Sequence, residues 1–156
     1  EYYLAPIPED ERDDLVAAYY KRLISPDDKI RIEAAKAWSI WEASTSKLFQ
    51  SGDYLHHFEN SSVAEAFARI ECHYFSNGGF FDTDEWLLEN VDKIRHIPTV
   101  IIQGRYDVVC PMISAWGLHC KFPEADFHVV QDAGHSMTEE GIAGKLVEYT
   151  DKYSDL

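Results

Sequence analysis

Two short apolar runs in the second half of the chain have the composition of buried β-strands. The first runs from Ile97 to Gln103, contains three consecutive β-branched residues and ends at Gly104. β-Branched residues favour extended backbone, so this run predicts a buried strand. The second run covers Phe127 to Val130, and the intervening segment Pro111 to Lys121 has the length and apolar content of a helix. A strand–helix–strand unit of this size predicts two parallel neighbouring strands.

Apolar residues recur at helical spacing over most of the remaining chain. Before residue 96 this periodicity predicts four helices, at about residues 9–23, 28–48, 62–75 and 83–94. Thr83 is the predicted cap of the fourth helix, and Asn77-Gly78-Gly79 is the predicted end of the third. Residues 50–62 are polar and predict a loop, and a last amphipathic helix is predicted over residues 139–153. The chain therefore changes near residue 96 from helices alone to alternating strands and helices.

The predicted sheet is too small to stand alone. A parallel sheet needs cover on both faces and further strands beside it. The sequence also begins at Glu1 rather than at a methionine. We therefore expect this chain to be a piece of a longer α/β protein whose other strands lie in sequence not shown here.

Candidate chemistry follows the ends of the two predicted strands. Asp107 lies three residues after Gly104, and His135 ends the segment that follows the second strand. Open α/β sheets place their active sites at the carboxyl edge, which both loops leave. An Asp and a His at this edge are two members of a hydrolase triad, and their order matches the Ser, Asp, His order of α/β-hydrolases. A Gly-His dipeptide alone is more often a simple turn, so both interpretations stay open.

The nucleophile of such a triad is absent from the sequence. No G-x-S-x-G turn occurs, and Asn77-Gly78-Gly79 is better explained as a helix end than as a Gly-rich oxyanion loop. If Asp107 and His135 belong to a triad, the serine and the oxyanion loop must lie outside this chain.

Composition and charge exclude several classes of partner. The chain has 156 residues, and its 28 acidic and 14 basic residues give a formal net charge of −14. This charge argues against nucleic acid and against anionic membrane surfaces as partners. No apolar run approaches the roughly 20 residues of a membrane span, and the N-terminal residues do not resemble a secretory signal.

The cysteines and histidines predict neither disulfides nor a metal site. The three cysteines are odd in number and include no C-x-x-C, which indicates a reducing, cytoplasmic compartment. Cys110 lies close enough to Asp107 to line the site, although a small buried thiol is the more common role. No group of side chains has the spacing of metal ligands, so we expect no metal.

Four sequence blocks in order resemble one family. They are APIPEDERDDLVAAYYKRL, AWSIWEASTS, ARIECHYFSNGGFF, and GRYDVVCP followed by AGHS. Together they cover nearly the whole chain and resemble the proline iminopeptidases (prolyl aminopeptidases) of the α/β-hydrolase superfamily. The resemblance implies a helical cap domain over residues 1–96 and the C-terminal part of an α/β-hydrolase core over residues 97–156. It also implies a serine peptidase without a cofactor that releases proline from peptides with a free N-terminal proline, with the N-terminal half of the core missing from this chain.

The resemblance gives roles to individual residues. Asp107 and His135 match the catalytic acid and base of the family, and Glu42 and Glu71 match the carboxylates that bind the α-amino group of the substrate. Phe75 matches an aromatic wall of the proline pocket, and Tyr74 is a weaker candidate for the same role. Ala43 stands where the family has glycine, which is a small departure from its pattern. Helical statistics alone favour Glu42 and Glu71 pointing outward into water.

Two other functions remain compatible with the sequence. Asp107 and His135 would serve equally well in another α/β-hydrolase, such as an esterase or an epoxide hydrolase, although paired carboxylates would then have no reason to converge. A truncated scaffold or binding protein without catalysis would keep the fold and lack the nucleophile.

Overall fold

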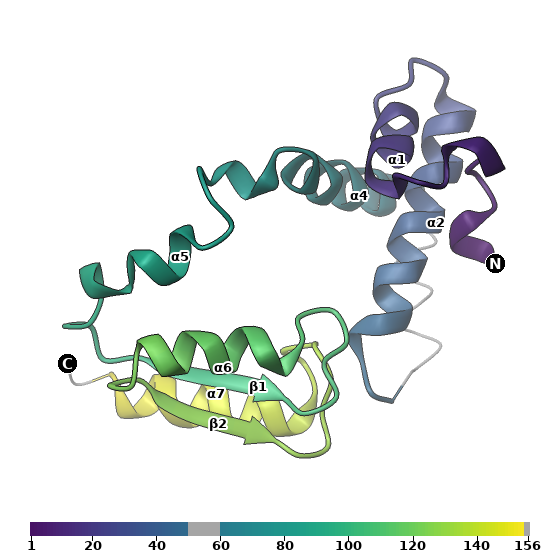
Figure 1. Cartoon of the computed structure of the whole chain (residues 1–156). Coiled ribbons are helices and arrows are strands. Elements are labelled where there is room, and N and C mark those ends of the chain that lie inside the picture. The colour runs from purple at the N-terminus through teal and green to yellow at the C-terminus, as the bar shows by residue number, and fades with distance from the viewer. Residues whose placement is uncertain (50–59, 155–156) are drawn as a thin grey trace. The chain divides into compact units, whose positions relative to one another are not determined.

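The computed structural model describes residues 1–49 and 60–154, which form two compact units (Figure 1). The first unit consists of Glu1–Ser44 and the described part of Gln50–Asp82, and the second consists of Thr45–Phe49 and the chain from Thr83 onward. The predicted loop over residues 50–62 lies mostly outside the described residues. The division into a cap over residues 1–96 and a hydrolase core over residues 97–156 stays a prediction.

The first unit is built from helices. Its elements are α1 (Leu15–Leu23), α2 (Asp28–Ser46, whose last two residues belong to the second unit), α4 (Ser61–Ser76) and short 3-10 helices at Tyr2–Leu4, Glu9–Glu11 and Gly78–Phe80. The predicted end of α4 is confirmed, because Asn77 is its C-cap and Gly78 and Gly79 follow with positive φ angles of 56° and 64°. Such angles cost glycine little and other residues much more.

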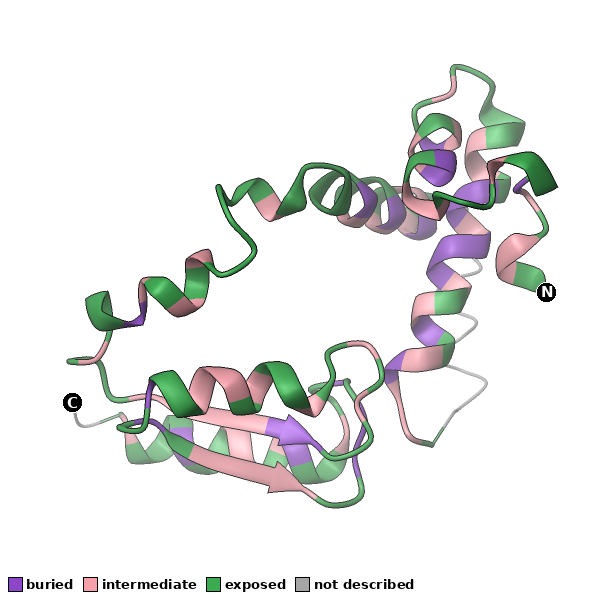
Figure 2. Ribbon diagram, in the orientation of Figure 1, coloured by how far each residue is buried: buried purple, intermediate pink, exposed green. Residues whose placement is uncertain are grey.

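Small side chains bring these helices close together. The buried residues of this core are Ile7, Ala18, Tyr19, Leu23, Ala34, Ala35, Ala37, Trp38, Ala64, Ala68 and Cys72. More than half of them are alanines, and Figure 2 shows buried segments along α2 and α4. The hydroxyl of Ser39, also buried, donates a hydrogen bond to the Ala64 carbonyl at 3.1 Å, so the polar group satisfies its need for a partner between the two helices.

The predicted start of the first helix at residue 9 is wrong. Glu9–Glu11 form a separate 3-10 helix, and α1 begins at Leu15 after the N-cap Asp14. The Asp14 carboxylate accepts a hydrogen bond from the Ala17 backbone N–H at 3.0 Å, which satisfies one of the free donors of the first turn. Glu11 instead binds two basic side chains of α1.

The second unit contains the predicted strand–helix–strand arrangement. Its elements are α5 (Trp86–Glu89), a 3-10 helix at Val91–Lys93, β1 (Val100–Gly104), α6 (Met112–Lys121), β2 (Asp126–Val130) and α7 (Glu140–Lys152). The strands are parallel, as predicted, in a register that pairs Val100 with Asp126 and Gly104 with Val130. The predicted helix over residues 83–94 is wrong in part. It is split in two, and Thr83 does not cap it, since its hydroxyl lies 3.5 Å from a Glu89 oxygen.

The helices α6 and α7 cover opposite faces of the two-stranded sheet (Figure 1). Successive side chains of a strand point to opposite faces. Accordingly, the Phe127 ring stacks on His119 of α6, whereas the next residue, His128, bonds to Tyr149 of α7. Most strand residues remain only half buried. Within the described residues, no helix is both long and apolar enough to cross a membrane.

Candidate active site

The carboxyl ends of β1 and β2 are drawn together by backbone contacts. Beyond the strands, the Arg105 N–H donates to the Val130 carbonyl and the Tyr106 N–H donates to the Ala133 carbonyl, each at 2.9 Å. A Cβ atom on Gly104 would lie only 1.8 Å from the Gly134 carbonyl oxygen. Only glycine at position 104 permits this approach, so the loop after β1 and the loop after β2 lie in contact.

Asp107 is held rigidly in the first of these loops. One carboxylate oxygen, Oδ1, accepts hydrogen bonds from the backbone N–H groups of Val109 at 3.0 Å and Cys110 at 2.7 Å. The side chain is only 7% exposed. The short Asp-Val-Val-Cys turn therefore fixes the orientation of the carboxylate before any partner is added.

His135 meets the other oxygen of this carboxylate. Its Nδ1 lies 3.0 Å from Asp107 Oδ2, and the imidazole is 39% exposed. Within the described residues the ring makes this one hydrogen bond, which leaves Nε2 for a reacting group. A carboxylate on Nδ1 selects the tautomer whose Nε2 accepts a proton and stabilises the imidazolium that results. The structure thus brings together the two residues that the sequence placed at neighbouring strand ends.

Gln103 is a member of this site that the sequence analysis missed. Its buried amide nitrogen donates to the Cys110 carbonyl at 3.0 Å and lies 3.4 Å from Asp107 Oδ2. A polar residue ending an otherwise apolar strand was the one available signal. Cys110, for which a buried thiol was the more common expectation, is exposed.

The candidate amine-binding carboxylates lie in the first unit. Glu71 of α4 accepts a hydrogen bond at Oε2 from the Trp38 indole Nε1, at 2.6 Å, and Trp38 itself is only 2% exposed. The prediction from helical statistics that Glu71 points outward into water is therefore wrong, since this carboxylate is half buried and bonded to the helix core.

The negative charges of Glu42 and Glu71 both contribute to the raised pKa of Tyr3. Burial and, after it, the negative charges of Glu42, Cys72 and Glu71 raise the pKa of the Tyr3 phenol to about 12. The Tyr3 ring also lies 5.2 Å from the Trp41 ring and 6.1 Å from the Trp38 ring, between centroids. The two carboxylates therefore share one aromatic neighbourhood.

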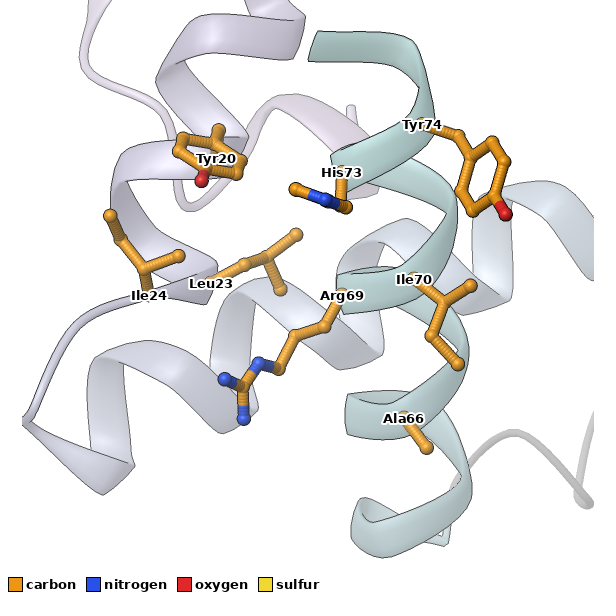
Figure 3. Close-up of a pocket in the computed structure, with 8 residues that line it drawn as sticks. All are labelled: Tyr20, Leu23, Ile24, Ala66, Arg69, Ile70, His73 and Tyr74. Atoms are coloured by element: carbon orange, nitrogen blue, oxygen red, sulfur yellow. The ribbon is translucent and has the colours of Figure 1, made fainter. Parts of the chain in front are cut away.

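Phe75 and Tyr74 have different surroundings. The Phe75 ring lies 6.0 Å from the Trp38 ring and is 54% exposed, one helical turn after Glu71. Tyr74 instead borders a pocket of about 490 Å³ between α1 and α4, in which Tyr20 and His73 face each other (Figure 3). Phe75 thus lies beside the Glu71 cluster, and Tyr74 faces a separate surface.

Metal ligands do not assemble in the described part of the chain. Among residues 1–49 and 60–154, no three His, Cys, Asp or Glu side chains are grouped so that they could hold a metal ion.

Comparison with known proteins relates the chain to one group of enzymes. It is 59% identical over 153 residues to the "Probable proline iminopeptidase" of Leptolyngbya boryana, and the match covers 98% of this chain and 48% of that protein. Proline iminopeptidases of Arabidopsis thaliana and Xylella fastidiosa are 53% and 48% identical, over 96% and 97% of this chain and 40% and 48% of their own lengths. No protein-family model matches the chain. The chain spans about half the length of these curated relatives, and over that half it is related by sequence to the proline iminopeptidases.

Proposed function

We propose that the full-length protein is a serine aminopeptidase that releases proline from the N-terminus of peptides. The Asp107–His135 pair at the carboxyl edge of two parallel strands carries the proposal, in a chain related to proline iminopeptidases. The half-buried sheet supports a larger core, whose remaining strands would come from sequence outside this chain. That part of the protein would supply the nucleophilic serine and the oxyanion donors.

The proposed chemistry moves one proton through His135 in acylation and one in deacylation. The serine hydroxyl attacks the carbonyl carbon of the N-terminal proline while His135 Nε2 takes its proton. His135 then returns the proton to the leaving amine as the peptide C–N bond breaks and leaves an acyl-enzyme. His135 then takes a proton from water as the water oxygen attacks the ester carbonyl, and it returns this proton to the serine oxygen as the ester C–O bond breaks and proline is released. Throughout, Asp107 holds Nδ1 and stabilises the positive imidazolium.

Glu42 and Glu71 would select the free N-terminus in this proposal. Their half-buried carboxylates lie near the same Tyr3 ring, and Trp38 orients one of them. A partly desolvated carboxylate pair attracts a secondary ammonium and rejects an acylated nitrogen. Phe75, exposed beside Trp38, would contact the pyrrolidine ring.

The test is an amidase assay on the full-length protein with proline and alanine amides, free and N-acetylated. We expect turnover of free proline amide, loss of turnover on acetylation, and a higher KM in Glu71→Gln. Asp107→Asn should lower kcat by about 10⁴-fold, the loss typical of a triad aspartate. Asp132→Asn, an exposed acid near the same strand end, is the matched control and should retain activity.

Two other outcomes would favour a different function for the full-length protein. Hydrolysis of simple esters with no need for a free amine would favour an esterase. A folded full-length protein that turns over none of these substrates would favour a non-catalytic scaffold.

A further inference from the structure

Glu139 occupies the N-cap position of α7, but its side chain makes no hydrogen bond to the first helical turn. Capping side chains usually accept from the N–H groups two or three residues ahead. Instead, Oε1 of Glu139 accepts a hydrogen bond from the Gly134 N–H at 2.7 Å, and Oε2 accepts one from the Leu48 N–H at 3.1 Å.

These two bonds hold the residue directly before His135. Gly134 is buried and tightly enclosed, because a Cβ atom there would lie 3.0 Å from the Leu48 nitrogen and 3.2 Å from Glu139 Oε1. The Ser46 carbonyl completes the attachment by accepting hydrogen bonds from the N–H groups of His135 at 3.0 Å and Ser136 at 2.8 Å. The loop that carries His135 after β2 is thus held on one side by hydrogen bonds that involve residues 46–48.

The other side of the loop rests on the end of β1. The Ala133 carbonyl accepts from the Tyr106 N–H, and the Gly134 carbonyl lies against Gly104. The Glu139 carboxylate is the one acidic side chain among these contacts, and it bridges two backbone donors from segments 86 residues apart in sequence. Such charge-assisted hydrogen bonds are roughly twice as strong as neutral ones.

We propose that Glu139 is a positioning residue for His135. By holding Gly134 in place, Glu139 fixes the position and orientation of the imidazole relative to Asp107. The inference rests on the proposed function, in which His135 carries the proton. Catalytic groups must be held within about 0.5 Å of the productive geometry, and a loop released at Gly134 loses that accuracy. The loosened His135–Asp107 contact then holds the imidazole less firmly for proton transfer.

The decisive variant is Glu139→Gln in the full-length protein, because the amide keeps the shape and places an N–H₂ group against one of the two backbone donors. We expect kcat for proline amide to fall 10- to 100-fold with KM within threefold of the wild-type value. Glu140→Gln removes the same charge one residue later, at an exposed position, and should leave kcat unchanged.

A spectroscopic readout separates this inference from the proposed function. We expect the hydrogen-bonded Nδ1 proton of His135 to give a far-downfield proton NMR resonance, which should shift upfield or broaden in Glu139→Gln and not in Glu140→Gln. This result supports the positioning role even if the wild-type protein hydrolyses no amide, an outcome that would sink the peptidase proposal alone. Glu139→Asp, too short to reach both donors, gives the same test if the glutamine variant does not fold. Unchanged kcat and an unchanged resonance would show that Glu139 contributes to stability alone and would overturn the inference.

Discussion

The two units of the chain are held together in different ways. The helical unit has a continuous apolar core in which alanines allow α1, α2 and α4 to approach, with Tyr19 and Trp38 filling the space between them. The strand-containing unit has a much smaller buried cluster, formed by Val91, Phe122 and Ala125, and most of its strand residues are only half buried. Its loops are held in place by backbone contacts and by polar side chains that hydrogen-bond to backbone groups.

This difference suits the chemistry proposed for each unit. The proposed amine-binding surface would need carboxylates among aromatic rings, and the helical core holds Glu71 beside Trp38 and Tyr3. The proposed proton-transfer pair would need two loops fixed against each other, and Gly104, Asp107 and Glu139 hold these loops through close approach and hydrogen bonds to backbone N–H groups. The helical unit should therefore be sensitive to side-chain volume, and the strand-containing unit to backbone displacement.

The largest effect is expected at the contact between the two loops. Gly104→Ala places a Cβ atom 1.8 Å from the Gly134 carbonyl oxygen, and backbone has to move to relieve the clash. We expect a loss of about 3 kcal/mol in the free energy of unfolding, the upper end of overpacking costs, together with at least a 100-fold fall in kcat. Denaturant titration and amidase assays of the full-length protein measure both.

Gly117→Ala is the matched control for this substitution. Gly117 lies within α6, and a Cβ atom there would meet nothing within 4 Å. Alanine in a helix is more favourable than glycine, so this variant should gain about 0.5–1 kcal/mol in stability. If Gly104→Ala were as stable as Gly117→Ala, backbone contact would not be what holds the second unit together.

The corresponding test in the helical unit changes volume. Ala68 is fully buried on α4, and Ala68→Leu adds three carbon atoms at this buried position. Overpacking of this kind costs about 1–3 kcal/mol. Ala66→Leu on the exposed side of the same helix should be neutral within about 0.5 kcal/mol, and equal behaviour of the two variants in thermal unfolding would remove the contrast between the units.

A smaller effect is expected where the helical core meets the proposed substrate. Trp38→Phe keeps an aromatic ring in the core and removes the Nε1–H donor to Glu71. A hydrogen bond to a charged group is worth about 1.5–3 kcal/mol, and part of that is recovered from water. We therefore expect KM for free proline amide to rise about tenfold with kcat within threefold. A fall in kcat without a change in KM would place Trp38 outside amine recognition.

Local sequence patterns predicted most of the fold, and distant contacts account for the rest. The β-branched run before Gly104 and the apolar spacing of α6 and α7 are local, so β1, β2 and both helices were predicted to within a few residues. The meeting of Asp107 and His135 followed from the topology, since parallel neighbours share a carboxyl edge. The bond from Leu48 to Glu139 joins residues 91 apart, and no pattern along the chain indicates it.

The misplaced start of the first helix leads to the smallest prediction. Glu11 does not start α1. It accepts hydrogen bonds from Lys21 at 2.7 Å and Arg22 at 2.6 Å, which hold its pKa below the usual 4.5. A lowered folded-state pKa means that the carboxylate stabilises the fold above about pH 4.5, and that this contribution disappears as the pH falls through the lower folded-state value. Urea titrations should therefore show Glu11→Gln to be less stable than the wild type at pH 7, with the difference in the free energy of unfolding shrinking as the pH drops below 4.5.

Glu9→Gln is the control. It removes the same charge from the same 3-10 turn, and among the described residues Glu9 forms no ion pair, so its stability relative to the wild type should not change with pH over this range. Parallel curves for Glu11→Gln and the wild type would mean that the ion pairs of Glu11 add nothing to the alanine-packed core.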